Sequence, residues 1–62
     1  MEVFVDGEPV DILPGMTVRH ALLAAGLWAE LDTVQVYDEW GNVLGLDGAL
    51  EEGTKLFVRS AP

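Results

Sequence analysis

Cysteine is absent from this 62-residue sequence. Its absence excludes disulfides and cysteine-ligated metal or iron–sulfur sites, and it fits a reducing compartment. Long apolar runs are also missing: none approaches the roughly 20 residues that a membrane-spanning helix requires. The acidic N-terminus has the alternation of a strand rather than the pattern of a signal peptide. The sequence therefore predicts a cytoplasmic protein that is not held in a membrane.

Positive charge is scarce. Only Arg19, Lys55 and Arg59 oppose eleven acidic residues, which leaves a formal net charge of −8. Nucleic acids and anionic membranes bind cationic surfaces, so both are poor partners for this chain. A basic or amphipathic protein surface is the natural counterpart. The simpler alternative is that the charge only keeps a small domain soluble and monomeric.

Residues that carry chemistry are equally few. The single histidine, His20, is expected on the exposed side of a helix, and the single serine, Ser60, lies near the end of the chain. The acidic pairs Asp38-Glu39 and Glu51-Glu52 lack the spacing of a calcium loop, and the glycines are too scattered for a phosphate loop. We therefore expect no catalytic residue, no metal site, no cofactor and no enzymatic activity.

The stretch Met16–Gly26, MTVRHALLAAG, is the one clear helical pattern. Thr17 is a good N-cap and Gly26 a good residue to follow the helix end. These signals predict a helix over Val18–Ala25, with Arg19 and His20 outside its apolar stripe. The stripe consists of Val18, Ala21, Leu22 and Ala25. A helix this short needs a surface to pack on.

Short strands are predicted on both sides of this helix from period-two alternation and turn residues. Asp6-Gly7-Glu8-Pro9 is the expected hairpin turn. The predicted strands are 1–6, 10–13, 33–38, 43–46 and 55–59. The predicted core consists of Val3, Val5, Val10, Ile12, Val18, Leu22, Val34, Val36, Leu50, Leu56 and Val58, with Leu27 or Leu31 closing its end.

The element order is ββαβββ, or ββαββ if the fourth strand is frayed. It predicts one α+β domain over residues 1–62, in which a mixed sheet carries the helix across one face. The first and last strands are expected to pair in parallel at the centre. The other face of the sheet is then bare.

This pattern resembles the β-grasp, or ubiquitin-like, fold over the whole chain. Met1–Val5 is similar to the first strand of ubiquitin. The series Phe4–Val10, Pro14–Val18 and a helix ending at Gly26 resembles the sulfur-carrier proteins of thiamine and molybdopterin synthesis, and also the β-grasp domains of [2Fe–2S] ferredoxin-type proteins. Leu50–Leu56 resembles the β-grasp ending of leucine, loop, glycine and last strand.

The chain departs from both functional patterns of these families. Sulfur carriers and ubiquitin end in Gly-Gly, whereas this sequence ends in Ser60-Ala61-Pro62. Ferredoxins place their cluster cysteines in a loop after the helix, where this chain has none. The resemblance therefore transfers neither thiolation chemistry nor cluster binding to any residue here.

The bare sheet face is the candidate site. Phe4 and Phe57 should lie on it from neighbouring strands, with Tyr37 joining from the third, and contiguous aromatic surface often marks interaction sites. Lys55 and Arg59 are expected at the rim, where they would make this face electrostatically distinct. The predicted protein-binding residues are therefore Phe4, Tyr37, Lys55, Phe57 and Arg59, with Glu2 and Gln35 at the rim. The alternative is that the rings only cover their own sheet.

A second candidate patch consists of Leu23, Leu27, Trp28 and Trp40, unless Trp28 only caps the core. Three functional interpretations remain open. The first is a non-catalytic ubiquitin-like module that binds a basic or amphipathic protein partner as a monomer or weak dimer. The second is a sulfur-carrier-like protein with a missing or altered tail. The third is a cluster-less ferredoxin-like domain or subunit of a redox enzyme.

Overall fold

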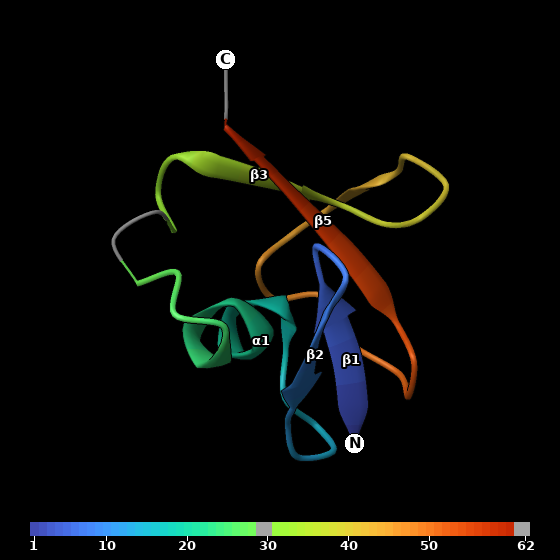
Figure 1. Ribbon diagram of the computed structural model, residues 1–62. Helices are drawn as coiled ribbons and strands as arrows, with labels where there is room; N and C mark the ends of the chain where they lie inside the picture. Colours follow the sequence, from blue (N-terminus) through green and yellow to red (C-terminus); the bar gives the residue numbers. More distant parts are fainter. Residues whose placement is uncertain (29–30, 61–62) are drawn as a thin grey trace.

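The computed structural model describes residues 1–28 and 31–60, so Ala61 and Pro62, which were compared with the Gly-Gly ending of sulfur carriers, lie outside the described residues. The elements follow the expected order ββαβββ (Figure 1). They are β1 (Glu2–Val5), β2 (Glu8–Asp11), α1 (Val18–Ala24), β3 (Val34–Tyr37), β4 (Val43–Leu44) and β5 (Lys55–Ser60).

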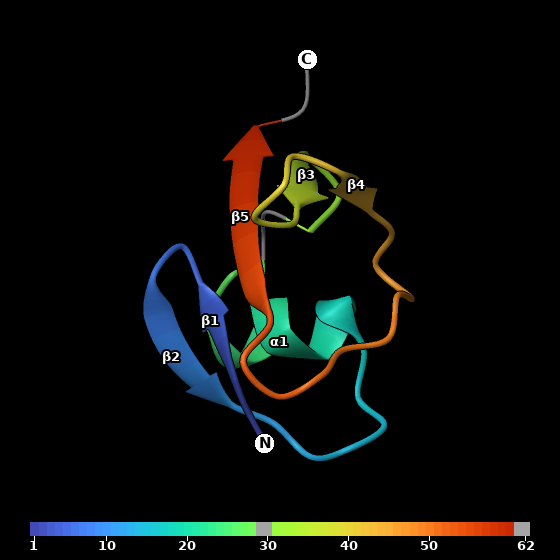
Figure 2. The same cartoon turned by 90° about the vertical axis from the view of Figure 1, so that its right-hand side faces the viewer.

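The strands form one mixed sheet in the order β2-β1-β5-β3-β4. β1 and β5 pair in parallel, and every other neighbouring pair is antiparallel. The parallel pairing of the first and last strands is confirmed, as is a fourth strand that pairs with β3. α1 lies against β1 and β2 on one side of the sheet (Figure 1), and Figure 2 shows the same arrangement turned by 90°.

The β1–β2 hairpin has a tight turn. Asp6 and Gly7 both have positive φ, 51° and 87°, which is the backbone of a type I′ turn. Val5 pairs with Glu8 directly after these two residues. The second strand therefore spans Glu8–Asp11, and its predicted range of 10–13 was wrong because the turn uses two residues instead of four. Pro9 is tolerated in it because β2 is an edge strand.

The first turn of α1 is held by the connection between β4 and β5. Thr17 is the N-cap in an extended conformation, as predicted. The N–H of Val18 donates to the carbonyl of Gly48 at 3.1 Å, and that of Arg19 donates to the carbonyl of Leu46 at 2.9 Å. These are donors that a helix start leaves without intrahelical partners. The loop satisfies them and is thereby fixed against the helix.

The helix ends one residue earlier than predicted, with Ala25 as its C-cap. Gly26 follows with φ 88°. Its N–H donates to Leu23, and the N–H of Leu27 donates to Leu22, both at 3.0 Å, which is the Schellman pattern. This turn directs Leu27 back against the buried cluster, as expected.

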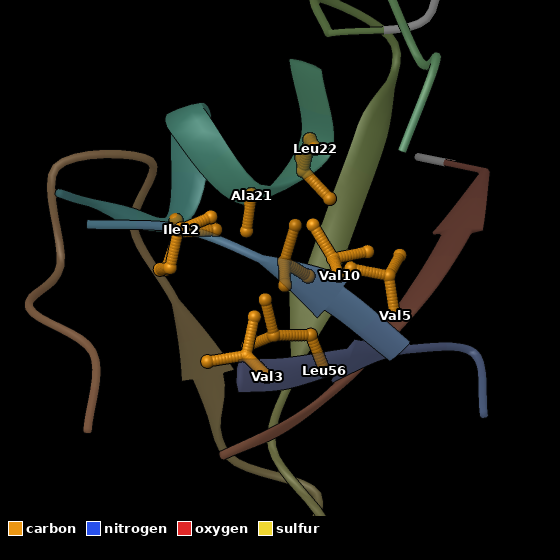
Figure 3. Close-up of a cluster of buried hydrophobic side chains, with 9 residues drawn as sticks. Val3, Val5, Val10, Ile12, Ala21, Leu22 and Leu56 are labelled. Atoms are coloured by element: carbon orange, nitrogen blue, oxygen red, sulfur yellow. The ribbon is translucent and has the colours of Figure 1, made fainter. Parts of the chain in front are cut away.

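The core lies between α1 and the sheet, with buried side chains from β2, β1, β5 and β3. Leu22 and Ala21 point from α1 toward the valines of β1 and β2 (Figure 3). The buried residues are Val3, Val5, Val10, Ile12, Val18, Ala21, Leu22, Val36 and Leu56. Ala21, which lies on the predicted apolar stripe, was missing from the predicted core.

Three residues of the predicted core, Val34, Leu50 and Val58, are only partly buried and pack against the edge of the cluster. Their position follows from the dimensions of the layers. A helix with its side chains is about 10 Å wide, whereas the strands of a sheet lie about 4.8 Å apart. One helix over β1 and β2 therefore covers only part of the sheet, and Val36 is the buried residue of β3.

Truncation of the central core residue should destabilise the fold. Leu22 is fully buried, so Leu22→Ala should lower the free energy of unfolding by about 2–5 kcal/mol through lost contacts and the cavity that remains. Urea denaturation followed by circular dichroism measures this change. Leu13→Ala is the matched control, because Leu13 is 66% exposed and its truncation should change stability by less than about 0.5 kcal/mol. Equal losses in the two variants would contradict this account of the core.

Candidate protein-binding face

The two phenylalanines lie on the sheet face that points away from α1. In β1, Phe4 is partly buried and stands between Val3 and Val5, which are buried under the helix. In β5, Phe57 follows Leu56, which has no exposed surface. Because successive side chains of a strand point to opposite faces, both rings project from the face without the helix. We call this the outer face, and it contains Phe4, Tyr37, Val43, Lys55, Phe57 and Arg59.

Strand register brings the aromatic residues together. Tyr37 of β3 is directly opposite Phe57 of β5. Phe4 is opposite Lys55 in the parallel pair, which makes Phe57 its diagonal neighbour, within reach of an aromatic side chain. Val43 of β4 pairs with Tyr37 from the other side. The outer face thus contains a continuous apolar row across three strands, with Phe4 beside it.

Sequence reasoning missed Val43. Its side chain is 62% exposed, which makes it the most accessible apolar residue of the outer face. Only the pairing of Val43 with Tyr37 shows that its side chain shares a face with the rings.

The two cations of the outer face are paired with carboxylates of the same chain. The Nη1 of Arg59 lies 3.2 Å from Oδ1 of Asp6, and the same oxygen accepts the N–H of Val58 at 3.1 Å. The Nζ of Lys55 lies 4.0 Å from Oε2 of Glu39. Each cation of the outer face therefore has a carboxylate of the same chain beside it. Such exposed pairs are worth about 0–1 kcal/mol each, so a partner can open them at little cost.

Asp38 organises the turn that connects β3 to β4. Its Oδ1 accepts the backbone N–H groups of Trp40 and Asn42, each at 2.9 Å, and its Oδ2 accepts the side-chain amide of Asn42 at 3.1 Å. The bond from the Asn42 backbone is the main reason that the pKa of Asp38 lies below its ordinary value, because these donors favour the charged carboxylate. The turn sets the start of β4 and thus the position of Val43.

The second patch proposed from the sequence does not form one surface. Leu27 packs against the core, and Leu23 lines a hollow of about 310 Å³ between β2 and α1. Trp40, which is 78% exposed, lines a different hollow of about 220 Å³ beside Glu51 and Glu52. Trp28 is 70% exposed, so it does not cap the core.

The described residues were also considered as metal ligands, as buried polar groups and as membrane-spanning segments. Within 1–28 and 31–60, no group of three or more histidine or acidic side chains is placed to hold a metal ion. None of the charged or polar residues in these two ranges is buried. No helix of the described chain combines the length and apolar character needed to cross a membrane.

Comparisons with protein-family profiles, with curated proteins and with solved structures gave no significant match.

Acid should loosen the β3–β4 turn. A carboxylate whose pKa is lowered by folding stabilises the fold above its unfolded pKa, and this contribution is lost as pH falls through the folded value. The bonds that Asp38 accepts from Trp40 and Asn42 should therefore weaken below about pH 4. The backbone amide shifts of those two residues, recorded by NMR between pH 7 and 2, measure the change.

Asp38→Asn provides the control for this titration, because an amide does not titrate in this range. In that variant the amides of Trp40 and Asn42 should keep constant shifts where the native protein shows a transition. An identical acid transition in both proteins would assign it to another carboxylate and contradict the proposed role of Asp38.

Proposed function

We propose that this chain is a small acidic β-grasp module of the ubiquitin-like kind, which acts without catalysis by binding a protein partner through the outer face of its sheet. The β-grasp assignment is supported by the ββαβββ order, the parallel β1–β5 pair and the single described helix on one face. It is also supported by the motifs at Phe4–Val10 and Leu50–Leu56.

The observation that carries the binding function is the alignment of Phe57, Tyr37 and Val43 across β5, β3 and β4. Aromatic residues bury a large area at little cost in conformational entropy and are enriched at the centres of interfaces. Phe4 extends this apolar surface onto β1. The helix stabilises the opposite face of the sheet, so it does not compete with a partner for these rings.

Charge defines the partner. The chain has a net charge of −8, and the only cations of the outer face, Lys55 and Arg59, already lie beside Glu39 and Asp6. A basic or amphipathic partner would place apolar groups on the rings and its own cations near the two carboxylates. Rim charges of this kind affect association rate and orientation more than affinity, so binding should weaken moderately with added salt.

Removal of either ring should weaken binding more than it weakens the fold. Phe4→Ala and Phe57→Ala should each raise the dissociation constant about tenfold or more, the range of central aromatic contacts. Both should lower the free energy of unfolding less than Leu22→Ala, because these rings are only partly buried. Trp28→Ala is the matched control, since Trp28 is equally apolar and 70% exposed but lies outside the outer face.

The partner needed for this measurement can be isolated by comparing the proteins that bind to the native chain with those that bind to the two variants. Proteins retained by the native chain and by Trp28→Ala, but not by Phe57→Ala, are candidates and are then titrated into the ¹⁵N-labelled protein. Shift changes should occur at Tyr37, Val43 and their neighbours while α1 remains unchanged. Changes confined to α1, or equal affinity of the native and Phe57→Ala proteins, would contradict the proposal.

The chain is also expected to lack enzymatic activity and redox cofactors. It has no cysteine, and its candidate bases and nucleophiles do not cluster in the described residues. Native mass spectrometry and a visible absorption spectrum of the protein purified from cells test this expectation. A metal ion or chromophore bound in stoichiometric amount would contradict it.

A further inference from the structure

His20 takes part in the cap of α1 through one particular ring nitrogen. The backbone N–H of Thr17 donates to Nδ1 of His20 at 3.0 Å, and Oγ1 of Thr17 lies 3.0 Å from the same nitrogen. Thr17 is the N-cap and His20 the third helical residue, so the arrangement is a capping box. Glutamate or glutamine ordinarily occupies this third position and accepts the N-cap N–H. Here an imidazole does so.

The hydrogen bond from Thr17 depends on the protonation state of this imidazole. A backbone N–H can donate to Nδ1 only when that nitrogen has a free lone pair, so the bond requires a neutral ring with its proton on Nε2. Both ring nitrogens of a protonated histidine are donors, and protonation would therefore leave the N–H of Thr17 facing another N–H. It would also place a positive charge at the positive end of the helix dipole.

We propose that His20 makes the first turn of α1 sensitive to pH: the cap is closed while the imidazole is neutral and opens when Nδ1 binds a proton. Glutamine at this position would accept the same bond whether or not acid is added, whereas an imidazole accepts it only in its neutral form. The choice of histidine thus adds a pH response to an interaction that is otherwise only structural.

Charged groups near His20 can change the pH at which the cap opens, but they are not the cause of the opening. Asp11 of β2 and the amino group of Met1 line the hollow of about 310 Å³ that His20 also lines. These two opposite charges lie 3.5 Å from each other. Arg19, the adjacent residue of α1, lies 3.6 Å from Asp47 of the β4–β5 connection. Each of these charges has an opposite charge beside it, so the bond between Thr17 and Nδ1 is the contact that protonation changes directly.

Opening of the cap would reach beyond the helix. Thr17 forms a β-bridge with Ala49, and the next two N–H groups donate to carbonyls of residues 46 and 48. The start of α1 and this connection therefore share one set of hydrogen bonds. Loss of the cap at Thr17 should loosen both segments together.

NMR tests the proposal on the intact chain. At neutral pH, long-range ¹H–¹⁵N correlations of His20 should show the Nε2–H form with a bare Nδ1. When acid protonates the imidazole, the hydrogen-exchange protection factor of the Thr17 amide should fall about tenfold, the order expected for loss of a helix cap. The Leu27 amide, bonded to Leu22 at the other end of the helix, is the internal reference and should remain protected.

Three variants separate the possible causes. His20→Gln should keep Thr17 protected with no dependence on pH, and His20→Ala should leave it unprotected throughout. Asp11→Asn should shift the midpoint of the transition without abolishing it. An Nδ1–H tautomer at neutral pH, constant protection of Thr17 through the histidine titration, or the same pH dependence in His20→Gln would each overturn the proposal. If His20→Gln does not fold, two measurements on the native protein test the proposal instead. These are the tautomer of His20 and the ratio of the Thr17 to the Leu27 protection factor as the pH is lowered.

Discussion

Packing of one short helix on a five-stranded sheet is the constraint on which the rest of this structure depends. α1 has only seven residues, and a helix of that length is unstable by itself in water. Its stability comes from burying Leu22 and Ala21 against the valines of β1 and β2. The same packing divides the sheet into one face closed by the core and an outer face available for contacts.

The ends of this helix are completed by other parts of the fold. Loop carbonyls and His20 accept the first N–H groups, and the Schellman turn at Gly26 satisfies carbonyls at the end. A small domain buries a modest share of its surface, so each satisfied backbone group matters more than in a large one. This gives His20 a structural role although its side chain is exposed.

The outer face depends on the sheet in a different way. Its residues come from β1, β3, β4 and β5, and the parallel β1–β5 pair joins the N-terminal hairpin to the other strands. The tight turns at Asp6-Gly7 and after Asp38 set the registers of the flanking hairpins. A slip of one residue in either hairpin would exchange inward and outward side chains, so these turns protect both the core and the candidate binding surface.

Local chemistry alone determined much of this protein. The helix at Val18, its N-cap at Thr17, the Asp6-Gly7 turn, the element order and most core residues follow from period, capping and turn preferences within a few residues of each position. Interactions between distant residues could be decided only by the tertiary structure. These include the pairing of Tyr37 with Phe57, the ion pairs of Lys55 and Arg59, the exposure of Trp28 and the partial burial of Val34. The physical reason is that register and coverage depend on how elements dozens of residues apart meet, which no local pattern encodes.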